Sequence, residues 1–146
     1  MLIDSEKFEV ALNEKGVLPA SAGAFSAPAD VVDMEMLASF GEAQIDGEPD
    51  IVVELIDLYV TDVAAKMSAL RGALDSSDGP ALRRLAHCLR GSSGNLGAHR
   101  VAALCKELEY VGGDDWRPAA VGLLLGLERE LARVEMIFAA ERRRRT

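Results

Sequence analysis

A histidine flanked by glycine and arginine is the feature of this 146-residue sequence best suited to chemistry. A helix advances about 100° per residue, which places His87 about 140° away from the apolar side of its own segment. Gly91 and Gly94 share this outer side. Glycine in mid-helix destabilises the helix, so a pair of glycines here indicates a functional reason for them. Three basic residues surround the same face: Arg83, Arg84 and Arg90. The pattern predicts an exposed imidazole that a second protein can approach closely.

An exposed imidazole in this setting is suited to accepting a phosphoryl group. Histidine supplies a neutral nitrogen nucleophile near pH 7, which can form a phosphoramidate. The arginines would place positive charge where the phosphoryl oxygens come to lie. An isolated surface histidine is more often an ordinary solvated residue. It is the combination of His87 with the glycines and arginines that favours a phosphoryl acceptor.

The segments that must position this histidine have the apolar spacing of helices, with gaps of three and four residues. Asp33 and Asp78 are good N-cap residues for two of them, and Pro49 suits the first turn of a third. The expected helices cover about 33–44, 49–74, 79–96, 101–111 and 116–142. Long amphipathic helices joined by short turns predict an all-α fold, an antiparallel four-helix bundle with a short additional N-terminal helix.

The chain divides into three expected parts. Residues 1–32 form an N-terminal segment and linker, 33–142 the bundle, and 143–146 a basic tail. Within the first part, 4–14 is compatible with a short helix, while the small residues, prolines and glycine of 18–30 are typical of a linker.

Composition and charge exclude several functions. Lys and Arg number 16 against 24 Asp and Glu, so the net charge of −8 disfavours nucleic-acid binding. The basic run 142–145 is interpreted as a complement to the dipole of the last helix. The longest apolar stretch, 119–127, is too short to cross a membrane, and the N-terminus lacks the pattern of a signal peptide. We therefore expect a cytoplasmic domain that contacts neither nucleic acid nor membrane.

The remaining reactive side chains do not form a second site in the sequence. Cys88 and Cys105 lie in apolar helical patterns and are expected to be reduced packing residues, and His99 an ordinary surface residue. No Cys/His cluster has metal spacing, and neither histidine follows a glutamate at the spacing that di-metal bundle enzymes use. The sequence also lacks a nucleotide-binding loop, so we expect no metal, no cofactor and no autonomous kinase activity.

Residues 86–98, Ala-His-Cys-Leu-Arg-Gly-Ser-Ser-Gly-Asn-Leu-Gly-Ala, resemble the signature of histidine-containing phosphotransfer (HPt) domains. The resemblance continues through 101–105 and covers about 33–141. It implies that His87 is the phosphorylated residue and that Arg90, where the family usually has lysine, neutralises the phosphoryl oxygens. It further implies that Gly91 admits the partner and that Glu109 orients the imidazole ring. The helical spacing adds Arg83 and Arg84 as supporting residues on the same face.

The resemblance implies a role as an intermediate of a two-component phosphorelay. A response-regulator receiver domain would donate its aspartyl phosphate to His87, which would pass the phosphoryl group to another receiver. Magnesium would belong to the receiver, and this chain would act as a monomer without a cofactor. A structural helical adaptor, with the same fold and no phosphotransfer, stays open as an alternative.

Residues 2–8 also resemble the end of a receiver domain. On that likeness the chain is the C-terminal piece of a hybrid sensor histidine kinase, whose parent protein could be membrane-anchored. A free-standing protein is the other possibility, and the sequence leaves both open.

Overall fold

The computed structural model describes residues 31–146, so the helix expected at 4–14, the linker at 18–30 and the receiver-like residues 2–8 lie outside it. Within the described residues every regular element is helical. These are α3 (Met34–Ser39), the 3-10 helix η2 (Phe40–Ala43), α4 (Ile51–Asp75), α5 (Gly79–Asn95), α6 (His99–Glu109) and α7 (Arg117–Arg145). The expected all-α bundle with a short N-terminal helix is confirmed.

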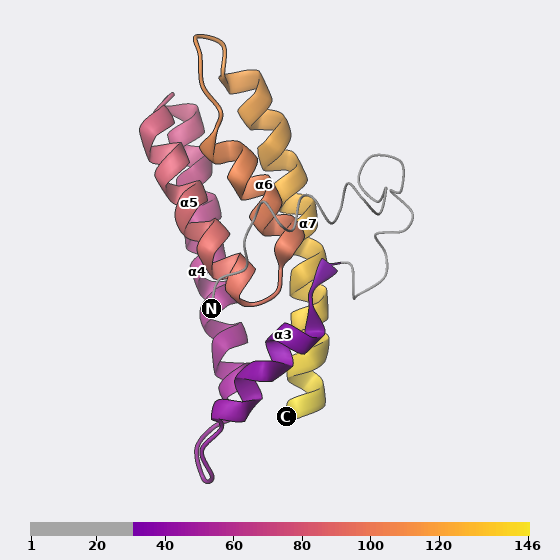
Figure 1. Cartoon of the computed structure of the whole chain (residues 1–146). Coiled ribbons are helices and arrows are strands. Elements are labelled where there is room, and N and C mark those ends of the chain that lie inside the picture. Colours follow the sequence, from indigo (N-terminus) through magenta and orange to yellow (C-terminus); the bar gives the residue numbers. More distant parts are fainter. Residues whose placement is uncertain (1–30) are drawn as a thin grey trace.

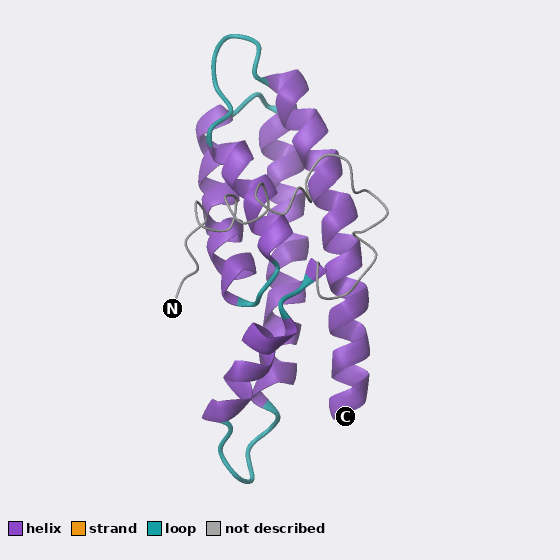
Figure 2. Cartoon of the chain, turned by 45° about the vertical axis from the view of Figure 1, so that its right-hand side comes forward, coloured by secondary structure: helices purple, strands orange, loops and turns teal. Residues whose placement is uncertain are grey.

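The four longer helices alternate in direction along the chain (Figures 1 and 2). α5 packs between α4 and α6, and α7 closes the bundle by packing against α6 and α4. α3 and η2 cross the lower end of the bundle in Figure 1, below the shorter helices α5 and α6. Two of the four bundle helices, α5 and α6, therefore form one side of the molecule.

Aspartate side chains begin three of the helices. Asp33 Oδ1 accepts from Met36 N at 3.1 Å, and Asp78 Oδ1 accepts from Ala81 N at 3.0 Å, which confirms both predicted caps. The predicted start of the long helix at Pro49 is wrong. Asp50 is the N-cap there, because its Oδ1 accepts from the first free backbone amides of α4, and Pro49 remains in the preceding loop.

The last helix is longer than expected at its C-terminal end. Residues 143–145 were expected as a basic tail, but α7 continues through Arg145. Ion pairs hold this last turn: Arg145 Nε lies 2.7 Å from Glu141 Oε2, and Arg142 Nε lies 2.9 Å from Asp57 Oδ1 on α4. The arginines of this turn therefore fasten α7 to its neighbours in addition to facing the negative end of the helix.

The core runs along the whole bundle and is almost entirely apolar. Its largest fully buried side chains come from each of the α-helices: Leu37, Ile56, Leu70, Leu82, Leu89, Leu108, Leu127 and Phe138. Two buried hydroxyl groups interrupt it, since Tyr59 and Ser93 share a hydrogen bond of 2.7 Å between α4 and α5. Because both groups are buried, this hydrogen bond fixes the position of the two helices relative to each other.

The start of α3 is fastened to the turn between α5 and α6. Asp33 N donates to Gly97 O at 2.8 Å, and Gly97 has φ +86°. A Cβ atom at Gly97 would lie 2.7 Å from Asp33 O, so both its conformation and its surroundings require glycine. The side chain of His99 is only 13% exposed and its Nε2 lies 3.7 Å from Asp33 Oδ2, so the expectation of an ordinary surface histidine is wrong.

Candidate functional site

His87 lies on the outer face of α5, as the helical periodicity predicts. The residues that α5 buries are Leu82, Ala86, Leu89 and Ser93, together with Gly79 at its start. His87 is on the opposite side, and 65% of its side chain is exposed. The helix thus holds the imidazole firmly by its backbone while leaving the ring open to a second protein.

Glu109, in the last turn of α6, contacts one nitrogen of this ring. Its Oε1 lies 2.7 Å from His87 Nδ1, and only 16% of the Glu109 side chain is exposed. A carboxylate oxygen accepts hydrogen bonds, so this contact favours the tautomer in which Nδ1 carries the proton. Nε2 then keeps its lone pair, which makes it the nucleophilic atom of the ring.

The three arginines that the sequence groups around His87 have different surroundings. Arg90 Nε lies 3.0 Å from Glu109 Oε2, in an ion pair that is not a well-aligned hydrogen bond. Arg83 Nη1 donates to Val111 O at 3.2 Å and so connects α5 to the end of α6. Arg84 is exposed, one turn before His87. Arg90 is therefore the cation held at the site, whereas Arg83 has a structural contact of its own.

The two glycines also differ. A Cβ atom at Gly91 would meet nothing within 4 Å, so the surface one turn beyond His87 is open, as expected. A Cβ atom at Gly94 would lie 3.9 Å from Ala102 Cβ, so Gly94 faces α6 and not only the solvent. Gly91 is the position at which a partner can come close to the backbone of α5.

The serines after Gly91 and the two cysteines complete this part of α5 and α6. Ser92 Oγ donates to Leu89 O at 3.2 Å, one turn back along α5, while buried Ser93 shares a hydrogen bond with Tyr59. Both cysteines are free thiols; Cys105 is buried, and burial raises its pKa. Cys88 is exposed beside His87, so its expected role as a packing residue is wrong.

The arrangement places a nucleophilic nitrogen, a carboxylate that orients it and an adjacent guanidinium at one exposed spot. Such a site can attack an electrophilic phosphorus atom and neutralise part of the charge on its oxygens. Across residues 31–146, no group of three or more His, Cys, Asp or Glu side chains could hold a metal ion. None of the helices in this range combines the length and apolar character of a membrane span.

The sequence matches the family model described as Hpt domain over residues 54–136, which is more than half of the chain. The fold is similar to the crystal structure of histidine-containing phosphotransfer protein B from Pseudomonas aeruginosa, with 36% sequence identity and a TM-score of 0.68. That similarity covers 80% of this chain and 97% of the Pseudomonas protein.

Two plant proteins are also similar. A histidine-containing phosphotransfer protein from maize shares the fold, with a TM-score of 0.66 and 21% identity over 94% of this chain and 95% of its own. Histidine-containing phosphotransfer protein 2 from Arabidopsis thaliana is 38% identical over 65 residues, which are 42% of this chain. The match spans 42% of that curated relative.

Proposed function

The chain belongs to the Hpt domain family, and from this membership we propose that it is a phosphorelay intermediate that carries a phosphoryl group on His87. The donor is the aspartyl phosphate of a receiver domain, and the acceptor is the aspartate of another receiver. The single observation that carries the proposal is the contact of 2.7 Å between Glu109 Oε1 and His87 Nδ1 on an exposed face. This contact leaves Nε2 free to react.

In the first transfer His87 Nε2 attacks the phosphorus atom in line with the aspartyl oxygen. The N–P bond forms, the P–O bond breaks, and the receiver aspartate leaves as a carboxylate. The proton on Nδ1 stays in place, so the phosphorylated ring carries a positive charge, which the carboxylate of Glu109 stabilises. The second transfer is the reverse reaction with another receiver.

Arg90 and Gly91 serve the same step in different ways. Arg90 lies one turn beyond His87, and its loosely aligned pair with Glu109 allows the guanidinium to turn toward phosphoryl oxygens. Gly91 lets the receiver bring its phosphoaspartate to Nε2 without meeting a side chain. In this proposal magnesium belongs to the acidic pocket of the receiver, and the chain itself works as a carrier without kinase activity.

Direct detection of phosphohistidine tests the proposal. The wild type, His87→Gln and the control His99→Gln are incubated with a phosphorylated receiver, and acid-labile phosphate on each protein is measured. We expect label on the wild type and on His99→Gln, and none on His87→Gln. Undiminished label on His87→Gln would remove His87 from the mechanism, and a wild type that no receiver labels would favour the structural adaptor.

A further inference from the structure

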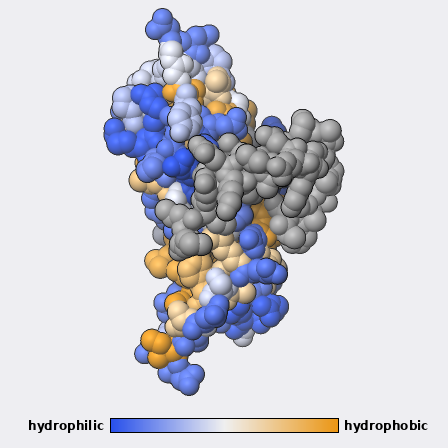
Figure 3. Space-filling view, in the orientation of Figure 1, coloured by the Kyte–Doolittle hydropathy of each residue, from blue (hydrophilic) through white to orange (hydrophobic). Residues whose placement is uncertain are grey.

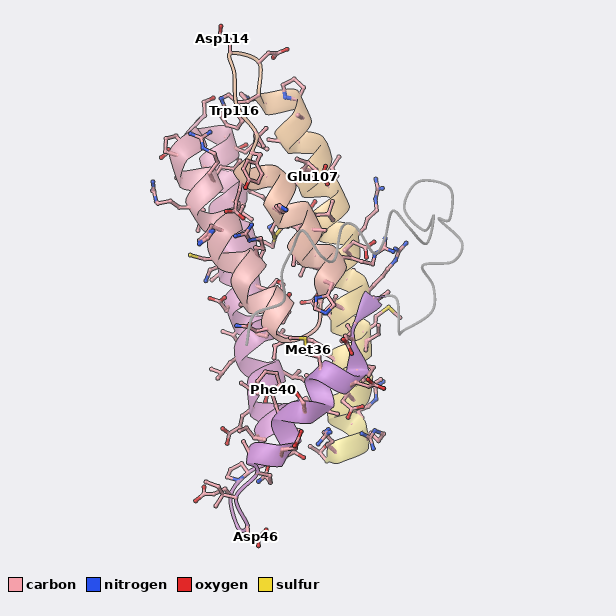
Figure 4. All side chains as sticks on the ribbon, viewed as in Figure 1. Met36, Phe40, Asp46, Glu107, Asp114 and Trp116 are labelled. Carbon is pink, nitrogen blue, oxygen red and sulfur yellow. The ribbon has the colours of Figure 1, made fainter. Side chains whose placement is uncertain are left out.

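Glu109 is the last residue of α6, which ends in the polar upper part of the molecule. In Figure 3 hydrophilic surface predominates over this part. Figure 4 shows Asp114 at the outer tip of the loop that follows α6, and Trp116 where the chain returns toward α7. Leu108 is the last fully buried side chain of α6, while Tyr110 is 76% exposed. The position of Glu109 therefore depends on polar contacts as well as on the core.

The backbone of α6 ends in short-range hydrogen bonds. Tyr110 N donates to Glu107 O at 3.1 Å. Val111 N donates to Leu108 O at 3.3 Å, again three residues back. Such bonds tighten the last turn of a helix but leave its final carbonyl groups without a helical partner. The carbonyl group of Val111, two residues beyond Glu109, therefore needs a donor from another part of the chain.

Arg83 of α5 supplies this donor. Its Nη1 donates to Val111 O at 3.2 Å, across the contact between α5 and α6. The guanidinium also places positive charge at the C-terminal end of α6, which is the negative end of the helix dipole. Gly79, one turn before Arg83, leaves room for it, because a Cβ atom there would lie 3.1 Å from Arg83 Nη1. Arg83 is thus held between the start of α5 and the end of α6.

The hydrogen bond of Arg83 lies beside the contact that orients the reactive ring. Arg83 and His87 are one turn apart on α5, about 6 Å along the helix axis. Their partners on the other side, Val111 and Glu109, are two residues apart at the end of α6. Arg90 also approaches Glu109, but without the alignment of a hydrogen bond. If the end of α6 moved away from α5, the bond of Arg83 would break and the orienting carboxylate would move with it.

We propose that Arg83 is a positioning residue for phosphotransfer, an inference that rests on the proposed function. By holding Val111, it keeps Glu109 against Nδ1 of the His87 ring, so that Nδ1 carries the proton and Nε2 keeps its lone pair. Without this bond the ring also populates the opposite tautomer, in which Nε2 carries the proton and cannot attack phosphorus. Arg83 touches neither the phosphoryl group nor the receiver, so it affects the rate of transfer and not the binding of the partner.

Two substitutions of similar length separate the hydrogen bond of Arg83 from the packing of its side chain. Arg83→Met keeps an aliphatic chain and has no donor, whereas Arg83→Lys keeps both a donor and a charge. The ring 15N chemical shifts of His87 report its tautomer in the free protein, at about pH 9, where imidazole side chains are ordinarily neutral. We expect a larger share of the Nε2-protonated form in Arg83→Met, and a share close to that of the wild type in Arg83→Lys.

Single-turnover transfer from a phosphorylated receiver measures the kinetic consequence. Arg83→Met should lower the rate at saturating receiver by about three- to tenfold and leave the half-saturating concentration unchanged. The loss should be the same at low salt and at about 0.5 M salt, because it does not come from long-range attraction. In the background of Glu109→Ala, Arg83→Met should have no further effect on the rate, since Arg83 acts through that carboxylate.

Arg117→Met is the matched control. Arg117 Nη1 likewise donates to a carbonyl group at the end of a helix, that of Leu74 in α4, and this bond joins α7 to α4 without involving α6. Loss of the bond should lower the free energy of unfolding, as it does in Arg83→Met. The tautomer of the ring and the rate of transfer should stay as in the wild type.

The outcomes separate this inference from the function on which it rests. A wild-type tautomer and a wild-type saturated rate in Arg83→Met would overturn the positioning role. Equal changes in Arg117→Met would overturn it as well, because general stability would then be the cause. Losses that multiply in the double variant with Glu109→Ala would show that Arg83 acts on the phosphoryl group directly. A wild type that no receiver labels would instead overturn the proposed function, while the tautomer of the free protein still tests Arg83.

Discussion

The carboxylate of Glu109 holds the Nδ1 side of His87 at 2.7 Å, although 22 residues separate them in the sequence. The reactive ring is thus oriented by a different helix from the one that carries it. Glu109 is also the more buried of the two, with 16% of its side chain exposed against 65% for His87. The carboxylate that orients the ring is thus held in place, while the nucleophilic ring itself stays accessible to a partner.

Glu109→Ala should slow transfer by roughly ten- to a hundredfold, because the ring loses both its hydrogen-bond acceptor and the charge that stabilises its phosphorylated form. Glu109→Gln keeps an acceptor without the charge and should fall between Ala and the wild type. Single-turnover transfer at saturating receiver measures both effects. Wild-type rates in the alanine variant would show that Glu109 does not orient the ring.

Gly91→Leu should slow transfer far more than it disturbs the fold. The added side chain meets nothing within 4 Å in the free protein, and leucine favours a helix over glycine by about 1 kcal/mol. Gly72→Leu on α4 is the matched control, since a Cβ atom there also meets nothing within 4 Å. If Gly91→Leu transfers within about twofold of the control, close approach at Gly91 is unnecessary.

Arg90→Ala should slow transfer by roughly ten- to a hundredfold at any salt concentration, because its guanidinium is held at the site. Arg84→Ala should have a smaller effect that fades toward about 0.5 M salt, where screening acts within a few ångströms. Arg83→Ala should lower the free energy of unfolding, since the bond to Val111 O is lost. If the transfer rate falls equally in Arg84→Ala and Arg90→Ala and both effects fade with salt, the two arginines only attract the receiver.

Gly97→Ala should lower the free energy of unfolding by about 2–4 kcal/mol, from the left-handed φ and from the clash with the backbone of Asp33. Gly113→Ala is the control, because Gly113 has φ +87° but open space around it. The free energy of unfolding of Gly113→Ala should fall by less, and this smaller loss should reflect the backbone conformation alone. Urea unfolding measures both values, and equal losses would show that the contact with Asp33 contributes little.

The stability of the protein should fall as the pH drops below about 6.5. Burial lowers the pKa of His99, while Asp33 opposes this shift, so the folded state favours neutral His99. A group with a lowered pKa stabilises the fold above its unfolded pKa and loses that contribution as the pH falls through its folded pKa. Urea midpoints between pH 7.5 and about 5 should decline in the wild type and in His87→Gln, and less in His99→Gln. If the urea midpoint of His99→Gln declines as much as that of the wild type, groups other than His99 cause the loss of stability.

The local rules of the sequence predicted the bundle and the position of His87. Asp33 and Asp78 act as caps, and the period of about 3.6 residues placed the histidine outward, because both effects depend on neighbours along the chain. The end of α7 was missed because its arginines pair with Asp57 on α4 and with Glu141, contacts that depend on the packing of two helices.

The contacts of the site depend on how helices meet, which the sequence alone does not give. The bond of Arg83 to Val111 and the burial of His99 against Asp33 join segments far apart in the chain. In the sequence, Leu58 is a leucine that lies off the apolar stripe of its helix. Only the fold shows that it borders a groove beside the histidine.

The reacting groups all project from the regular turns of α5 and α6, and no loop carries any of them. Little conformational entropy is therefore lost on this side when a partner arrives, since the backbone is already ordered. A partner that meets this surface needs only the right orientation to bind. After the partner is released, the same rigid surface is available to the next one. Any closing motion around the phosphoryl group must come from the protein on the other side.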